Sequence, residues 1–178
     1  QSGCDTVLKR MNRHYTTGEY LQGVRCLRKY FKHPAITTDV IVGYPGETEA
    51  DFEASSHLVE QVGFARIHVF PYSARKGTPA ASMPDQLPRA VREERARRLI
   101  ATGHAVAARW AEGQLGRIRP VLIEDHEGGF SRGYTPEYAP ALLPGAAAGE
   151  IVYARLDAWT GAAFQAAVCQ TPPVTTGL

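Results

Sequence analysis

The sequence predicts a parallel α/β unit followed by a small all-β barrel, in a chain of 178 residues. Residues 16–112 read as helix, strand, helix, strand and helix with short connections. Parallel strands need such crossover helices between them. From Gln114 the chain changes to five short strand-like runs that Gly and Pro separate, which is typical of a small barrel. We therefore expect an α/β part over 1–113, a β-barrel over 114–170 and a flexible tail over 171–178.

The composition is that of an ordinary globular protein. The chain has 44% hydrophobic and 21% charged residues, which argues against disorder and against a coiled coil. Its apolar stretches are broken well short of the roughly 20 residues that a membrane helix needs. The three cysteines are an odd number without paired spacing, so they do not indicate a secreted disulfide framework. We expect a cytoplasmic location and no membrane partner.

The charge of the chain is uneven. Residues 1–113 contain 16 Lys/Arg and 12 Asp/Glu, whereas residues 114–178 contain 4 and 6. A mildly basic first part hints at a polyanionic partner, although most such surfaces are simply solvated.

The first helix and strand of the α/β part follow from local signals. Thr16 and Glu19 have the spacing of a capping box, and apolar residues then recur at helical spacing. The stretch "AITTDVIVG" at 35–43 is β-branched and mostly apolar, which is typical of a strand covered on both faces. The expected apolar stripe of the helix consists of Leu21, Val24, Leu27 and Phe31.

A second helix begins at "TEAD", where Thr48 and Asp51 repeat the capping pattern. The stretch "ARIHVFPYS" at 65–73 predicts the next strand, and a Pro-rich connector leads to a long helix over about 88–112. We expect Leu99, Val106 and Trp110 on the buried side of this helix. The opposite side is interpreted as an ordinary solvated face and carries Arg89, Arg92, Arg95 and Arg98.

Two or three parallel strands make a sheet too small to cover its own faces and edges. The α/β part is therefore expected to be the latter part of a larger barrel or sheet. The five runs after Gln114 fit an antiparallel barrel of the oligonucleotide-binding general type, with "HEGG" as its first hairpin turn.

The turn "GYPGET" follows the first strand, at the strand end where ligands of parallel α/β proteins collect. A phosphate loop is disfavoured because Glu47 stands where such loops need Lys beside Ser or Thr. A close backbone approach at Gly43 suits a mostly neutral ligand, such as an adenine edge or a ribose. The simpler alternative is that Gly43 and Gly46 only make a tight turn.

Three stretches carry a family resemblance: "QSGCDTVLKRMNRHYT", "TTDVIVGYPGETEADF" and "HVFPYSARKGTPAASMPDQLP". They resemble successive segments of the radical S-adenosylmethionine (SAM) methylthiotransferases, and residues 114–170 resemble the TRAM domain that ends those proteins. The resemblance implies the latter part of an incomplete TIM-like barrel and a small OB-like barrel. It also implies SAM and two [4Fe–4S] clusters as cofactors, one cluster to cleave SAM and one to supply sulfur.

Within the family, the sequences of these motifs are most similar to the branch that adds a methylthio group to threonylcarbamoyladenosine beside the anticodon. The partner that this resemblance implies is a tRNA anticodon loop. Related enzymes that act on isopentenyladenosine in tRNA or on a ribosomal-protein aspartate remain alternatives. A non-catalytic RNA-binding module is a third interpretation.

The resemblance also implies a set of SAM-binding residues. Arg13 would pair with the methionine carboxylate, because a guanidinium can donate two parallel hydrogen bonds to it. Val42 and Gly43 would pack beside the adenosine. The full set comes from three strand ends and one loop, and consists of Gln1, Ser2, Arg13, Val42, Gly43, Phe70 and Tyr72.

The expected RNA-binding residues are cations of a strand-end loop and cations interleaved with aromatic residues in the barrel. The aromatic residues Phe130, Tyr134 and Tyr138 are equally expected as barrel core. The last domain is acidic overall, which fits poorly with RNA affinity based on phosphate contacts. The RNA-binding set is Arg75, Lys76, Arg117, Arg119, Arg132 and Tyr134.

The sequence lacks the cluster motif of the family it resembles. Cys4, Cys26 and Cys169 do not have the Cys-x-x-x-Cys-x-x-Cys spacing, and we expect Cys26 to be a small core residue. His68 is expected to be packed or hydrogen-bonded within its strand. We therefore predict no metal site and no catalytic residue here, and a chain that is inactive without a preceding N-terminal part of the same protein.

Overall fold

The computed structural model describes residues 1–169, which fall into two compact units. Unit 1 comprises Gln1–Ala107, and unit 2 begins at Ala108, within the long helix α4 (Arg89–Glu112). The predicted tail at 171–178 lies outside the described residues. No helix in the described part of the chain is long and apolar enough to cross a membrane.

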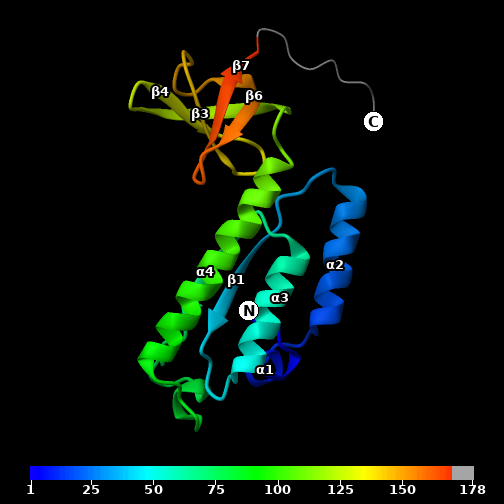
Figure 1. Cartoon of the computed structure of the whole chain (residues 1–178), viewed down its shortest axis with the longest axis vertical. Helices are drawn as coiled ribbons and strands as arrows, with labels where there is room; N and C mark the ends of the chain where they lie inside the picture. The colour runs from blue at the N-terminus through cyan, green and yellow to red at the C-terminus, as the bar shows by residue number, and fades with distance from the viewer. Residues whose placement is uncertain (170–178) are drawn as a thin grey trace. The chain divides into compact units, whose positions relative to one another are not determined.

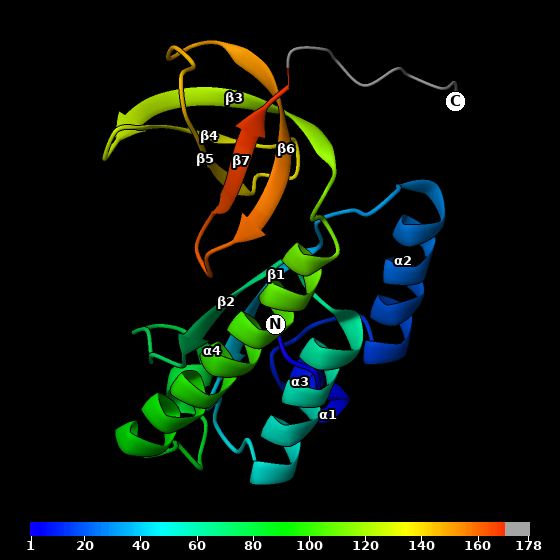
Figure 2. The same cartoon turned by 45° about the horizontal axis from the view of Figure 1, so that its top comes forward.

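Unit 1 contains a parallel two-stranded sheet, as predicted. The strands β1 (Thr37–Val42) and β2 (Arg66–Pro71) pair in register from Thr37 opposite Arg66 to Val42 opposite Pro71. The crossover between them is α3 (Glu49–Val62), and Figures 1 and 2 show α3 and α4 over the same face of the sheet. The remaining elements are α1 (Asp5–Arg10), α2 (Thr17–Tyr30) and the 3-10 turn η1 (Pro79–Ser82).

Both predicted capping boxes are present. The Thr16 hydroxyl accepts from the Glu19 N–H, and the Glu19 carboxylate accepts from the Thr16 N–H at 2.7 Å. The Thr48 and Asp51 pair repeats this arrangement at the start of α3. Satisfying the free N–H groups at the start of a helix stabilises it. The sequence did not predict α1, which is only six residues long.

The core of unit 1 lies between the sheet and its helices. Val40 and Val42 of β1 pack with Phe52 of α3 and with Leu99 and Val106 of α4. The last two confirm the buried side expected for α4.

Two expected apolar faces are wrong. One face of β1 is covered at Val40 and Val42, whereas the other face is exposed at Asp39 and only partly covered at Ile41, which packs against a cluster formed by Val7, Tyr44 and Tyr72. In α2 the stripe ends at Val24, since Leu27 and Phe31 are exposed by 44% and 59%. Periodicity shows that a face is apolar, but only the packing decides whether it is covered.

Unit 2 is the predicted five-stranded barrel, closed in the order β3-β4-β5-β7-β6. The Gly128-Gly129 turn has φ of 59° and 84°, as a two-residue hairpin of this twist requires. The barrel is not wholly antiparallel, because β5 pairs with β7 in parallel. Its strands are β3 (Ile118–Glu127), β4 (Phe130–Tyr134), β5 (Pro140–Leu143), β6 (Ile151–Trp159) and β7 (Phe164–Val168).

Candidate functional site at the ends of β1 and β2

The chain before α1 lies beside β1. The Ile41 N–H donates to the carbonyl oxygen of Gln1 at 3.0 Å. The first residues are thus joined to the edge of β1 by a backbone hydrogen bond. The Ser2 hydroxyl lies 3.2 Å from that of Ser55, which accepts the Gly3 N–H at 2.9 Å. These bonds hold the first residues against α3 at the sheet edge.

The turn after β1 is held from inside by Glu47. Its carboxylate is buried and accepts the Gly43 N–H at 2.8 Å. Arg95 of α4 donates to the same Oε1 at 2.7 Å and to the Glu47 carbonyl at 3.0 Å. Burial raises the pKa of Glu47, while the Gly43 N–H and Arg95 act in the opposite direction. Glu47 therefore organises the turn and is not directed toward a ligand.

The arginine face expected to be solvated is so only at Arg89, whose side chain is 83% exposed, whereas Arg95 and Arg98 form an interface within unit 1. The Arg95 side chain is only 6% exposed and also reaches Glu49 at 3.2 Å. Arg98 pairs with Glu49 and Glu53. Sequence spacing showed one charged face of α4 but not the carboxylates that α3 and its preceding turn bring against it.

Arg92 covers the backbone where β1 ends. A Cβ added to Gly43 would lie 2.4 Å from Cγ of Arg92, and the φ of Gly43 is +72°. The Arg92 guanidinium donates to the carbonyl of Tyr72, directly after β2. The close approach expected at Gly43 is thus made by an arginine of the same chain in this structure.

The Tyr72 hydroxyl, directly after β2, has no hydrogen-bond partner within residues 1–169. The residue is 8% exposed and its ring meets that of Tyr44 edge-on at 5.3 Å. Its hydroxyl and Nε of Arg92 are buried and have no hydrogen-bond partner within residues 1–169. Buried polar groups are normally paired, so these two atoms are exceptions among the described residues.

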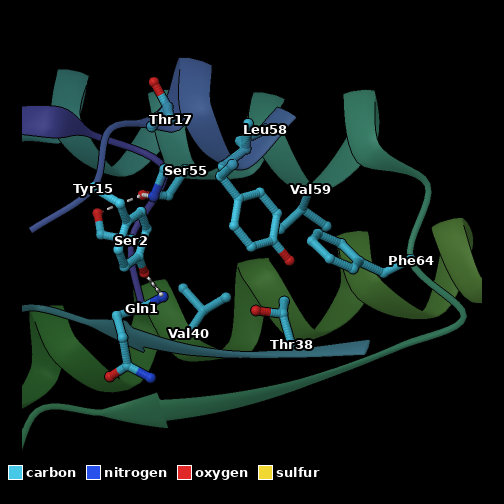
Figure 3. A pocket seen from close by; sticks show the side chains of 12 residues that line it. Gln1, Ser2, Tyr15, Thr17, Thr38, Val40, Ser55, Leu58, Val59 and Phe64 are labelled. Atoms are coloured by element: carbon cyan, nitrogen blue, oxygen red, sulfur yellow. Dashed lines mark hydrogen bonds between the residues drawn. The ribbon is translucent and has the colours of Figure 1, made fainter. Parts of the chain in front are cut away.

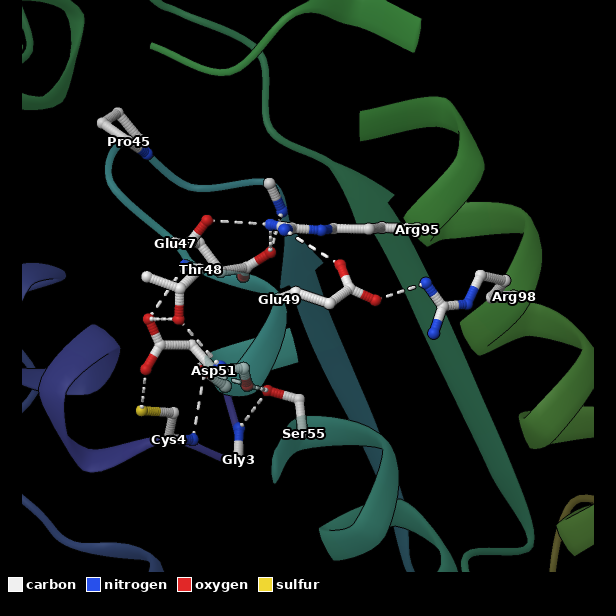
Figure 4. A network of polar contacts seen from close by, with 12 residues as sticks. Gly3, Cys4, Pro45, Glu47, Thr48, Glu49, Asp51, Ser55, Arg95 and Arg98 are labelled. Atoms are coloured by element: carbon white, nitrogen blue, oxygen red, sulfur yellow. Dashed lines mark hydrogen bonds and ion pairs between the residues drawn. The ribbon is translucent and has the colours of Figure 1, made fainter. Parts of the chain in front are cut away.

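A second network joins α1 to the start of α3. The Cys4 thiol donates to Oδ1 of Asp51 at 2.9 Å (Figure 4). Nη2 of Arg10 lies 3.6 Å from Oδ2 of the same carboxylate. Arg10 also donates to the Pro45 carbonyl at 3.1 Å. Cys4 is thereby engaged in local structure.

A mainly apolar hollow lies between β1, α2 and α3 (Figure 3). Its cavity volume of about 20 Å³ admits a water molecule and not a nucleoside. Its lining includes Gln1, Ser2, Tyr15, Thr38, Val40 and Ser55.

The predicted SAM-binding residues divide into two groups. Gln1 and Ser2 lie beside β1 before α1, whereas Arg13 is exposed in the segment between α1 and α2. Val42, Gly43 and Tyr72 lie together at the strand ends. The Tyr72 N–H donates to the Val42 carbonyl, and the Arg92 side chain contacts both Gly43 and the Tyr72 carbonyl. Phe70 is 50% exposed on β2, opposite Ile41 of β1.

The predicted RNA-binding residues are also separated. Arg75 and Lys76 are exposed in the loop after β2. Arg119 pairs with Glu137, and Arg132 pairs with Asp125. Arg117 is half-buried just before β3, and Tyr134 stacks at a tilt on Tyr138 with ring centres 5.4 Å apart.

The barrel aromatics are at the surface. Phe130 and Tyr138 are 49% and 74% exposed, and Tyr134 is half-buried outside the hydrophobic core. Of the two interpretations offered by the sequence, the barrel core is therefore wrong for these residues.

The described residues do not fit an iron–sulfur cluster. Among residues 1–169 no group of three or more His, Cys, Asp and Glu is placed to hold a metal ion. Cys26, expected in the core, is exposed on α2. His68, expected to be packed or hydrogen-bonded, is exposed on β2. Arg13 carries an exposed guanidinium, a group whose chemistry suits a carboxylate, and the Tyr72 hydroxyl and Arg92 Nε are buried without a hydrogen-bond partner among residues 1–169.

Sequence reasoning did not predict that Asp39 is exposed or that Glu47 pairs with Arg95. Asp39 interrupts an otherwise apolar strand, and a charge at such a position signals an uncovered face. No local signal identified the pair, because its members are 48 residues apart.

Comparison with known proteins adds a family likeness. Residues 1–59 match the model of the Radical SAM superfamily. A tRNA-2-methylthio-N(6)-dimethylallyladenosine synthase of Streptomyces coelicolor is 46% identical over 130 residues, and one of Paenarthrobacter aurescens is 48% identical over 128. Each alignment covers 72% of this chain. A synthase of the same name from Caldicellulosiruptor saccharolyticus is 44% identical over 126 residues, or 71% of this chain.

The chain spans about a quarter of the length of these curated relatives, 25% for the first two and 27% for the third. A solved multidomain protein with nucleic acid binding domains from Streptococcus pneumoniae aligns with 33% of this chain and 23% of its own. Its TM-score of 0.27 and identity of 14% are too low to inform the fold. The relatives support the resemblance to radical SAM methylthiotransferases at the level of the family.

Proposed function

We propose that this chain forms part of a radical SAM methylthiotransferase that adds a methylthio group to an N6-modified adenosine of tRNA. The observation that carries the proposal is the identity of 44% to 48% with tRNA methylthio synthases, over more than two thirds of the chain. The unit 1 sheet is then a segment of an incomplete TIM-like barrel, and unit 2 is a TRAM domain. The proposed substrate implies a cytoplasmic location.

In this proposal the two halves of the site have separate tasks. Arg13 binds the methionine carboxylate of SAM, with Gln1 and Ser2 beside it. Val42 and Gly43 form the adenosine wall, and Phe70 and Tyr72 border the adenine. When bound, SAM and two [4Fe–4S] clusters supply the radical and the sulfur, and residues elsewhere in the protein hold the clusters. The residues named here bind and orient the cofactor.

The relatives favour dimethylallyladenosine, which is isopentenyladenosine, as the nucleoside. The ones described above carry that nucleoside in their names. The second candidate is threonylcarbamoyladenosine. It is favoured by the sequences of three motifs, "QSGCD", "AITTDVIVGYPGET" and "HVFPYSARKGTPA".

Mass spectrometry of tRNA nucleosides from a strain lacking the gene tests both candidates. Loss of methylthio-dimethylallyladenosine, with accumulation of dimethylallyladenosine, supports the first. Loss of methylthio-threonylcarbamoyladenosine alone supports the second. If both methylthio nucleosides persist at normal levels, the proposed function is wrong.

Arg13→Ala tests the carboxylate contact in the complete protein. We expect weaker SAM binding in a calorimetric titration, because the partner of the carboxylate is lost, and an unchanged circular dichroism spectrum. His14→Ala is the matched control, since His14 is exposed and adjacent. Equal affinities of the two variants would remove Arg13 from the site.

The RNA side of the proposal rests on Arg75 and Lys76 in the loop after β2, with Arg117, Arg119, Arg132 and Tyr134 of the barrel as further contacts to the anticodon loop. Support for the loop comes from its exposed cations, which form no ion pair within residues 1–169. Arg75→Ala and Lys76→Ala should each lower the salt dependence of tRNA binding, whereas loss of a neutralised cation should change it less.

A further inference from the structure

The C-terminal end of α2 carries an exposed surface that the proposed site does not use. We define the α2 patch as Arg25, Lys29, Tyr30, Phe31 and Lys32. Tyr30 and Phe31 are 71% and 59% exposed, and the three cations are exposed as well.

The cations of the α2 patch are not neutralised. None of the three forms an ion pair within residues 1–169, and the sequence has no Asp or Glu between Glu19 and Asp39. The neighbouring Arg28 has a different task, because it donates to the carbonyls of Val62 and Gly63 at the end of α3. The contact of Arg28 anchors the patch on unit 1.

In the barrel, most arginines are neutralised by carboxylates. Residues 114–178 contain four arginines, and three of them pair with carboxylates: Arg119 with Glu137, Arg132 with Asp125, and Arg155 with Asp157. Free positive charge beside free aromatic rings is therefore a feature of the α2 patch.

Stabilisation of α2 accounts for one cation of this surface, Lys29, but not for its exposed aromatic rings. Cations in the last turn stabilise a helix by interacting with its dipole, and Lys29 also lies over the Tyr30 ring at 5.5 Å. Neither effect needs two aromatic rings in solvent. Exposed rings beside unpaired cations are the combination that binds single-stranded nucleic acid, since rings stack on bases and cations contact phosphates.

We propose that the α2 patch binds RNA with unpaired bases. Arg25, Lys29 and Lys32 contact phosphates, while Tyr30 and Phe31 stack on bases. The inference rests on the proposed function for the identity of the RNA, a tRNA loop. It adds a contact surface on unit 1 that is separate from Arg75 and Lys76.

The test measures binding of a fluorescein-labelled RNA hairpin with an unpaired loop, and of its fully paired duplex, by anisotropy. The protein is the whole chain of 178 residues. Arg25→Ala/Lys29→Ala should lower the slope of log affinity against log salt by about 0.7 for each lost phosphate contact. Tyr30→Ser/Phe31→Ser should weaken hairpin binding by about fivefold or more and leave duplex binding unchanged.

The matched control is Arg89→Ala/Arg97→Ala, which removes two exposed cations that are paired with Glu93 and Glu94 on α4. Its affinity should stay within the error of the unaltered chain. Circular dichroism checks that each variant keeps its helices.

Three outcomes would overturn the proposal: no hairpin binding by the unaltered chain at low salt, equal losses in patch and control variants, or a patch whose aromatic variant abolishes self-association and leaves RNA affinity unchanged. The last outcome would make the patch an interface between copies of the chain. Nucleoside analysis of the deletion strain reports on the proposed function independently, so the two ideas can fail separately.

Discussion

Arg95 and Glu47 form a buried ion pair, with Nη1 of the arginine 2.7 Å from Oε1 of the glutamate and side chains 6% and 1% exposed. The same Oε1 accepts the N–H of Gly43, so one carboxylate joins α4 to the turn that ends β1. The guanidinium also lies 5.6 Å from the centre of the Phe52 ring. The pair fixes the wall that the proposed function assigns to adenosine.

Removal of the Glu47 carboxylate should destabilise unit 1. Glu47→Ala leaves the Arg95 charge buried without its partner, a change that typically costs about 3–5 kcal/mol. Urea unfolding followed by circular dichroism measures this, because the helices lie mainly in unit 1. Tryptophan fluorescence is an internal control, since Trp110 and Trp159 both belong to the barrel unit.

The matched variant for Glu47 is Glu49→Ala. Glu49 also pairs with Arg95, but its side chain is 57% exposed, so we expect a loss below about 1 kcal/mol. Similar losses for the two variants would show that the buried pair has no special role.

Gly43→Ala should destabilise the turn by about 1–3 kcal/mol. It combines a φ of +72° with a contact of 2.4 Å to Cγ of Arg92. Gly77→Ala separates the two effects, because Gly77 has a φ of +85° and no atom within 4 Å of an added Cβ. Thermal unfolding of both variants measures the difference.

The double variant Gly43→Ala/Arg92→Ala isolates the contact. If Arg92 is what the new methyl group meets, the double variant should lose less stability than the sum of the two single variants. Additive losses would contradict the close approach of Arg92 to Gly43.

Gly133→Ala should disrupt the barrel. An added Cβ would lie 2.1 Å from the carbonyl oxygen of Leu122, a backbone atom of the paired strand that no side-chain movement can relieve. We expect a loss of at least about 2 kcal/mol in unfolding followed by tryptophan fluorescence. Gly145→Ala, at a position with open space, should cost only its backbone strain. Equal losses would contradict the packing seen between β3 and β4.

The stability of unit 1 should fall in acid. Hydrogen bonds from the Thr16 N–H and hydroxyl lower the pKa of Glu19 below its ordinary value of 4.5. Burial alone would raise the pKa of Asp51, but bonds from Cys4 and Thr48, with the charge of Arg10, lower it below 3.8. Both carboxylates therefore contribute stability that is present above these ordinary values and is lost as the pH falls through the folded-state values.

Comparison with Asp51→Asn identifies the groups responsible for the acid response. The variant keeps an oxygen at the capping position but does not titrate, so its unfolding free energy should fall less steeply below pH 3.8. An equally steep fall would place the acid response in other groups.

Much of the fold was predictable from local patterns. The capping boxes at Thr16 and Thr48 and the five strands of the barrel follow from signals within a few residues. The parallel pairing of β1 with β2 follows from the alternation of helices and strands along the chain. The Gly128-Gly129 hairpin follows from the positive φ that two such residues allow.

The candidate site was predictable only in outline. The sequence located the turn at Gly43 as the end of a strand, but its patterns did not show that Arg92 occupies the space beside it. Leu27 and Phe31 had the spacing of a buried stripe and are exposed, while Arg95 had the spacing of a solvated face and is buried.

By itself the sequence determined the order of the longer helices and strands and the starts of α2 and α3, because capping, turn chemistry and periodicity act between near neighbours in the chain. The tertiary structure alone decided which faces are covered and which charges meet. Glu47 and Arg95 are 48 residues apart, and only the crossover of α3 and the return of α4 bring them together. Burial and pairing depend on such distant contacts, which no local pattern contains.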